Sequence, residues 1–172
     1  MRVAIFGIGN VLAHDDAAGP SVVCLLDAHW TFPEGVVVED IGTPALELPT
    51  HLAGYDRVIL VDAVEADAPA GTIRIYRREE ILLHPPGLRL SPHDPALKET
   101  LMLLELTGEA PADLVLVGVV ARVTEMGVGL SDEVRAALMP AAEAVVAQLA
   151  GMGLPPTRRE TPRAPDLWWQ AA

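Results

Sequence analysis

Three short stretches of this 172-residue sequence carry side chains that can bind metal ions or transfer protons. Asp15 and Asp16 follow an apolar, glycine-containing run, Asp62 ends a second apolar run, and His93 precedes a segment with helical periodicity. Two carboxylates and one imidazole suit a divalent ion such as nickel, zinc or manganese. Three protein ligands leave coordination positions open, which is typical of a site that meets a substrate.

Each of these residues also has an ordinary structural explanation. An Asp just ahead of a helix is most often an N-cap, which is the simplest interpretation of Asp15 and Asp16. Asp62 at the end of an apolar strand needs hydrogen-bond partners to offset its desolvation. His93 before a helix N-terminus is favoured in its neutral form, and alone it is more often structural. The functional hypothesis therefore depends on whether the fold gathers these residues.

The elements that must gather them are apolar runs alternating with helical patterns. Apolar runs bounded by Gly, Pro or Asp predict strands over residues 3–8, 35–40, 57–62 and 114–120. Helical periodicity predicts helices over residues 17–30, 94–107 and 131–150, the last with Ser131 as its N-cap. Because strands with almost no polar alternation are covered on both faces, the sequence predicts a layered α/β domain.

A further strand-like segment, residues 71–77, alternates with period two and is typical of a sheet edge. Only residues 63–70 separate it from the strand before it, whereas a parallel crossover needs about a dozen residues. We therefore expect it to run antiparallel. Residues 78–92 then return the chain to the opposite end of the sheet and place His93 near the carboxyl ends of the parallel strands, where α/β folds bind ligands.

Composition excludes several classes of function. Lys and Arg number 12 against 24 Asp and Glu, and the net charge of −12 repels phosphate backbones and anionic lipids. The longest apolar stretch, residues 114–121, is shorter than the ~20 residues of a membrane span, and residues 1–7 are better explained as a strand than as a signal peptide. We therefore expect a cytoplasmic protein without nucleic-acid or membrane partners.

Two other kinds of catalytic or binding site fail on the sequence. The Gly-x-Gly at residues 7–9 lacks the third glycine of a dinucleotide fingerprint, because position 12 is Leu12. The single cysteine, Cys24, lies inside an apolar helical pattern, which is typical of a core residue and not of a nucleophile. One cysteine also excludes an intramolecular disulfide and a thiolate metal cluster, and no catalytic triad is assignable.

The C-terminal residues 155–172 differ in composition from residues 1–154. They contain four prolines, three arginines and the pair Trp168-Trp169. We expect residues 1–154 to form a single catalytic α/β domain and residues 155–172 to form a tail. A partly disordered extension is the simpler interpretation of this tail, and a docking segment anchored by the two tryptophans is the alternative.

Five elements of the sequence occur together in a distinctive order. The most specific runs from Gly7-Ile8-Gly9-Asn10-Val11-Leu12 to Asp15-Asp16. The others are Asp40-Ile41-Gly42-Thr43 with Glu47-Leu48, Val61-Asp62-Ala63, Ser91-Pro92-His93, and Leu116-Val117-Gly118-Val119 with Gly129-Leu130-Ser131. Together they cover most of the chain, and the set resembles the nickel-iron hydrogenase maturation endopeptidases.

This resemblance implies a three-layer α/β/α sandwich with a mixed five-stranded sheet, order 2-1-3-5-4 and strand 4 antiparallel. It implies an endopeptidase that removes a C-terminal peptide from the nickel-loaded precursor of a hydrogenase large subunit. Asp16, Asp62 and His93 fall on the family's metal-ligand positions and are the catalytic candidates. The nickel is carried by the precursor, and no organic cofactor is implied.

Some alternatives remain open at this stage. Either a carboxylate such as Asp16 or Asp62 acts as general base for water, or the metal activates the water or the carbonyl. A nickel chaperone or metal-responsive binding protein would use the same three ligands without cleaving its partner, and a hydrolase of small peptides is a third hypothesis. No heptad pattern predicts a dimer, so we expect a monomer.

Overall fold

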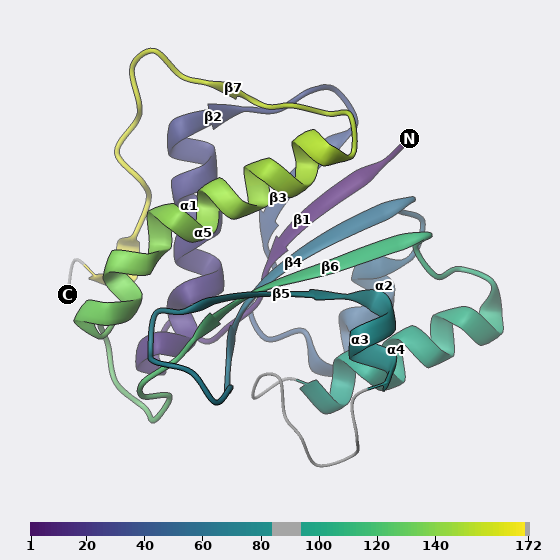
Figure 1. Cartoon of the computed structure of the whole chain (residues 1–172), viewed down its shortest axis with the longest axis horizontal. Helices are drawn as coiled ribbons and strands as arrows, with labels where there is room; N and C mark the ends of the chain where they lie inside the picture. Colours follow the sequence, from purple (N-terminus) through teal and green to yellow (C-terminus); the bar gives the residue numbers. More distant parts are fainter. Residues whose placement is uncertain (84–93, 171–172) are drawn as a thin grey trace.

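The computed structural model describes residues 1–83 and 94–170 of the chain (Figure 1). Its main sheet has the order β3-β1-β4-β6-β5, with bounds β1 (Val3–Gly7), β3 (Val36–Asp40), β4 (Arg57–Val64), β5 (Ile73–Arg77) and β6 (Asp113–Val120). β5 pairs antiparallel with β6, and the other pairs are parallel. Counted along the chain within this sheet, the order is 2-1-3-5-4 with strand 4 antiparallel, so the prediction is confirmed.

Helices cover both faces of the sheet and make a three-layer sandwich (Figure 1). One face packs against α1 (Ala18–His29) and α5 (Asp132–Gly151). The other face packs against α2 (Leu48–Leu52), α3 (Arg78–Leu83) and α4 (Asp94–Thr107). The three long helices begin and end within a residue or two of the predicted bounds. α2 and α3 are short helices that the sequence did not predict.

Strand β4 shows why the predicted strands are almost continuously apolar. Ile59, Val61 and Ala63 belong to the core on the α1 and α5 side. Leu60 and Val64 belong to the core on the α2 and α4 side. Successive side chains of a strand point to opposite faces, so a strand between two helical layers buries every side chain. Asp62 lies between Leu60 and Val64 and shares their face.

The last helix begins as the sequence predicts. Ser131 is the N-cap of α5, and its Oγ accepts a hydrogen bond from the backbone N–H of Val134 at 3.5 Å. Asp132 and Glu133 occupy the first turn, where the helix dipole favours negative charge. This end of α5 adjoins the loop that follows β6.

The C-terminal residues do not form the disordered extension that composition favours. β7 (Thr157–Arg158) pairs antiparallel with β2 (Trp30–Thr31) at the end of α1. The backbone N–H of Arg163 donates to the carbonyl of Ala28 at 2.9 Å, and Trp169, in the turn η3 (Trp168–Gln170), is buried. The described part of the tail therefore packs on the rest of the chain through Trp169, whereas Trp168 is 65% exposed. The boundary at residue 154 stays a prediction.

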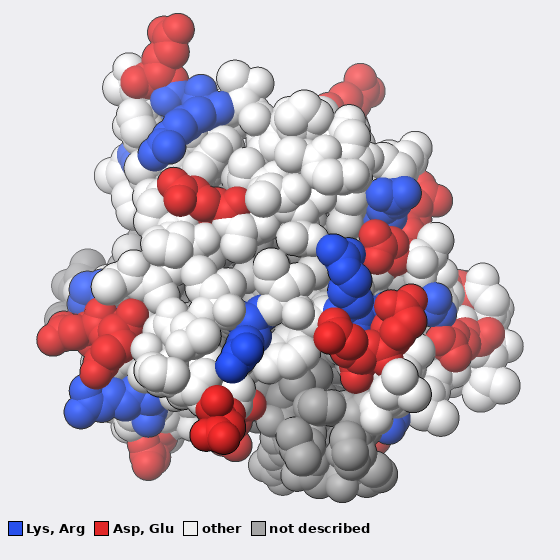
Figure 2. Space-filling model, viewed as in Figure 1, with Lys and Arg blue, Asp and Glu red and all other residues white. Residues whose placement is uncertain are grey.

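Charges on the surface agree with the acidic composition. Basic side chains on the face shown in Figure 2 lie beside acidic ones. Such a face offers no extended track for a phosphate backbone.

None of the described helices combines the length and the apolar character needed to cross a membrane.

Candidate active site at the carboxyl edge of the sheet

Asp16 lies in the 3-10 turn η1 (His14–Ala17), which connects β1 to α1. Its side chain is only 3% exposed, and Oδ2 accepts a hydrogen bond from the backbone N–H of Asn10 at 2.7 Å. Gly9 has φ +148°, and a Cβ at this position would collide with the carbonyl oxygen of Asp16. The glycine therefore lets the loop fold tightly over the turn that holds the carboxylate.

Asp62 lies near the carboxyl end of β4 and is also 3% exposed. Its cross-strand neighbour in β6 is Gly118. The first turn of α1 packs directly on this end of β4. Gly19 permits this close contact, because a Cβ at its position would collide with the carbonyl oxygen of Val61. The backbone N–H of Ile8 donates to the same carbonyl oxygen at 2.8 Å. The segments that carry Asp16 and Asp62 are therefore held against each other at the carboxyl edge.

The third predicted ligand, His93, lies outside the described residues. Within residues 1–83 and 94–170, no group of three His, Cys, Asp or Glu side chains is arranged to hold a metal ion. The structure therefore brings together the segments of the two predicted carboxylates, and the complete set of three ligands stays a prediction.

The N-cap interpretation of Asp15 and Asp16 is wrong. Neither η1 nor α1 has a side-chain cap. Asp15 is instead fully buried, and its carboxylate accepts four hydrogen bonds from the chain that follows β6. Oδ2 accepts from the N–H groups of Arg122 and Val123 and from the Ser131 hydroxyl, at 2.9, 3.1 and 2.9 Å. Oδ1 accepts from the Ser131 N–H at 2.7 Å.

Residues 10–16 and 121–131, hereafter the loop pair, are joined by further backbone contacts. The N–H of His14 donates to the Gly127 carbonyl, and the N–H of Gly127 donates to the Leu12 carbonyl, both at 2.8 Å. His14 Nδ1 lies 3.0 Å from the Gly129 carbonyl oxygen. A Cβ at Gly127 would collide with the His14 ring. These partners are far apart in sequence, and the only sequence signal for them is the pair of glycines in the second loop.

The surroundings of Cys24 disfavour its thiolate form. Burial, followed by the negative charges of Asp40, Asp166 and Asp27, raises the pKa of its thiol to about 11. Its Sγ donates to the Asp166 carbonyl at 3.2 Å, inside the contact between α1 and the tail. The interpretation of Cys24 as a packing residue is consistent with this environment.

Asp40, at the end of β3, belongs to the second of the five sequence elements. The pKa of its carboxyl group is raised, chiefly by partial burial. The hydrogen bond from Gly42 opposes this shift, and the charge of the nearby Glu39 adds to it. The bond from the Gly42 N–H to Oδ1 is 2.9 Å long, and the Gly42 carbonyl in turn accepts from Gly9 at 2.9 Å. Asp40 thus shapes the turn that supports the Asp16 loop from the β3 side.

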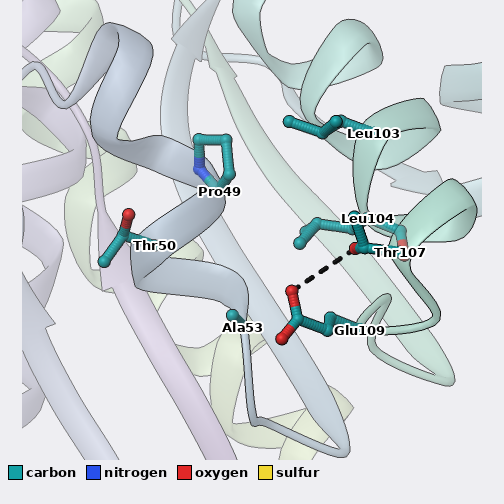
Figure 3. A pocket seen from close by; sticks show the side chains of 7 residues that line it. All are labelled: Pro49, Thr50, Ala53, Leu103, Leu104, Thr107 and Glu109. Carbon is teal, nitrogen blue, oxygen red and sulfur yellow. Dashed lines mark hydrogen bonds between the residues drawn. The ribbon is translucent and has the colours of Figure 1, made fainter.

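A hollow of about 280 Å³ lies between α2 and α4 (Figure 3). It is lined by Pro49, Thr50, Ala53, Leu103, Leu104, Thr107 and Glu109. Glu109 accepts a hydrogen bond from the Thr107 hydroxyl at 3.3 Å, the dashed line in Figure 3. None of the lining residues belongs to the segments that carry Asp16 or Asp62, so this hollow is separate from the candidate site.

Comparison with known proteins connects this edge to one family of enzymes. A family model described as hydrogenase maturation protease matches residues 20–148. The chain is 38% identical over 165 residues to the hydrogenase 2 maturation protease of Escherichia coli K12, covering 93% of this chain and 98% of the relative. It is 36% identical to a hydrogenase expression/formation protein, HupM, of Azotobacter chroococcum mcd 1, covering 92% and 77%.

Solved structures agree. The hydrogenase maturating endopeptidase HybD from E. coli superposes with a TM-score of 0.83 at 35% identity, covering 92% of this chain and 98% of that one. The [NiFe] hydrogenase maturation protease HybD from Thermococcus kodakarensis gives a TM-score of 0.70 at 30% identity, covering 87% and 99%. With its fold and nearly its full length matched, the chain belongs to the hydrogenase maturation proteases, a family of peptide hydrolases.

Proposed function

We propose that this protein is an endopeptidase that removes a C-terminal peptide from the nickel-loaded precursor of a nickel-iron hydrogenase large subunit. The observation that carries the proposal is the position of Asp16 and Asp62, two nearly buried carboxylates on adjoining segments of the carboxyl edge. In a member of a peptidase family, such a pair is the natural candidate for contact with the substrate's metal and with water.

The proposed contact with nickel is a means of reading the substrate. Asp16, Asp62 and His93 would offer two carboxylates and one imidazole to the metal of the precursor. These donors are harder than thiolates, so they are suited to touching a metal held by thiolates without removing it. A precursor without nickel lacks this contact, which makes cleavage conditional on a filled metal site.

Cleavage adds one water molecule across the peptide bond. The water oxygen bonds to the carbonyl carbon, the carbon–nitrogen bond breaks, and the departing amine takes a proton. An ionised Asp16 or Asp62 can accept the proton of the water and return it to the amine. The metal of the precursor is the alternative source of activated water. A pH–rate profile of each carboxylate variant tests the two routes, because the variant that removes the base loses the corresponding titration.

The proposal is tested by incubating the protein with nickel-loaded and nickel-free precursor and weighing the products by mass spectrometry. The wild type should shorten only the loaded precursor. Asp16→Asn, Asp62→Asn and His93→Ala should each reduce the rate by at least about a hundredfold. Asp56→Asn is the matched control, because Asp56 binds the backbone N–H of Arg2 at the opposite edge of the sheet. Full activity of all three site variants would end the metal-reading account.

The same assay separates the other hypotheses. A nickel chaperone would bind nickel tightly by itself and leave the length of its partner unchanged. A general peptide hydrolase would cleave a short synthetic peptide in the absence of the folded precursor. The proposal includes a cytoplasmic monomer, which cell fractionation and light scattering test.

A further inference from the structure

We propose that the outer side of the loop pair is the surface on which the folded precursor docks; this inference builds on the proposed function. Three apolar side chains are exposed there: Leu12, Met126 and Val128, at 46%, 73% and 48%. They come from two segments more than a hundred residues apart in the sequence, and we call them the apolar rim. Exposed apolar clusters beside a site are typical of protein contacts.

The backbone explains why these side chains lie close together. Ala13 and Gly127 form an isolated parallel bridge between the two loops. Ala13 is buried, and Gly127 faces the His14 ring. Leu12 lies in a turn and Met126 in a bend, each directly before a bridged residue, so the bridge brings the two exposed residues close together. These residues belong to two paired loops and not to a frayed end of the chain.

The rim is held in a fixed shape before any partner arrives. The two backbone hydrogen bonds of Gly127, the contact of His14 with Gly129 and the four bonds to Asp15 all join the same loops. A surface that is already ordered loses little conformational entropy when it binds. The loop pair therefore presents its apolar side chains as a rigid platform.

The occupant is identified by the position of the rim relative to Asp16. The N–H of Leu12 donates to Asn10 Oδ1 at 3.0 Å, and the N–H of Asn10 donates to Asp16 Oδ2 at 2.7 Å. A protein that brings its metal to Asp16 must therefore contact the loop that displays Leu12. We commit to the folded precursor, with apolar residues around its metal site, as this partner. A short unfolded peptide would reach the carboxylates without covering both loops.

Two exposed leucines of α4, Leu103 and Leu106, do not share this connection. Leu103 lines the hollow between α2 and α4, and Leu106 is 86% exposed on the same helix. Neither belongs to a segment bonded to the Asp16 loop. Leu103 therefore marks a competing docking surface, and Leu106 provides a control substitution that should not affect binding.

The test measures KM and kcat for the nickel-loaded precursor, together with its Kd by calorimetry. Leu12→Ser combined with Met126→Ser should raise KM and Kd by roughly tenfold, with kcat and the melting temperature unchanged. Leu12→Met should behave as wild type, because it keeps an apolar side chain of similar size. Leu106→Ser should change neither constant.

Two outcomes overturn the inference. An unchanged Kd in the double variant would show that the rim does not bind the precursor. A rise in Kd for Leu103→Ser, without one for the double variant, would place docking at the α2–α4 hollow. Failure of the proposed function looks different, since the wild type would then leave every precursor uncut. In that case Kd still decides whether the rim binds the precursor.

Discussion

The loop pair and the C-terminal tail both join segments that are distant in the sequence, but different kinds of interaction hold them. The loop pair surrounds a fully buried carboxylate, Asp15, with four donors. The tail attaches through the two-residue strand β7, a few backbone hydrogen bonds and ion pairs such as Arg158–Glu143, whose atoms are 3.9 Å apart and whose side chains are exposed.

The difference lies in what each group loses when its partner is removed. The Asp15 carboxylate is fully buried and cannot turn to water when a donor is removed, so each lost bond exposes much of its desolvation penalty. Exposed ion pairs return to solvent and contribute between about zero and 1 kcal/mol. We therefore expect the loop pair to unfold only with the whole domain and the tail to detach locally.

The largest expected effect follows from Asp15→Ala. It leaves four donors around an empty, buried position and should lower the free energy of unfolding by about 3–5 kcal/mol. Urea unfolding followed by circular dichroism measures this change. Asp15→Asn keeps one acceptor oxygen and should lose less. A loss below about 1 kcal/mol for Asp15→Ala would contradict the contrast between the two regions.

A smaller effect is expected for Ser131→Ala. The substitution removes one bond to Asp15 and the N-cap of α5, and together these should cost about 2 kcal/mol. Ser21→Ala is the matched control, because the Ser21 hydroxyl is buried and has no hydrogen-bond partner among the described residues. This control should leave stability unchanged or raise it. Equal losses of unfolding free energy in Ser131→Ala and Ser21→Ala would show that the Ser131 bonds to the loop pair do not stabilise the fold.

Within the tail, the expected effect is smaller again. Trp169→Ala should lower stability by roughly 1–2 kcal/mol, because detachment of the tail limits the loss. Its neighbour Trp168 is 65% exposed, so Trp168→Ala should change stability by less than about 0.5 kcal/mol. Limited proteolysis should cut the Trp169→Ala tail while the domain stays intact. If the Trp169→Ala variant resists proteolysis as well as the wild type, the tail does not detach locally, and it is held as firmly as the loop pair.

The smallest effect concerns reactivity. The thiol of Cys24, with its pKa raised to about 11, is protonated at neutral pH. Labelling by iodoacetamide should therefore be slow at pH 8 and should rise with pH until the thiolate predominates above about 11. Removing residues 155–172 takes away Asp166 and part of the cover, so the thiol should label faster at pH 8. Unchanged labelling of the shortened chain would contradict the described contact.

Much of the fold follows from local pattern. The four apolar runs predicted the parallel strands, and the short connection before residues 71–77 predicted the antiparallel direction of β5. Periodicity predicted the three long helices, whereas α2 and α3, at five and six residues, are too short to show a period. The position of Asp16 after β1 and of Asp62 near the carboxyl end of β4 was sufficient to place both segments at one edge.

Sequence reasoning failed where the partner of a residue is remote. Asp15 resembles an N-cap in its local sequence, but its donors lie 107 to 116 residues away and leave no local signal. The tail is similar, since its proline-rich composition indicates disorder while its contacts with Trp30 and α1 depend on the tertiary fold. Composition indicates how a segment behaves in isolation, whereas the conformation of these two segments depends on contacts with distant parts of the chain.

The long separation between Asp15 and its donors also sets an order on assembly during synthesis. Strands β1, β3 and β4 can pair as soon as residue 64 has emerged from the ribosome. The Asp16 turn receives its last support only when Ser131 follows, late in translation. The nascent chain therefore holds part of its sheet before it holds the completed loop pair, so the buried position of Asp15 should form only after residue 131 has been synthesised.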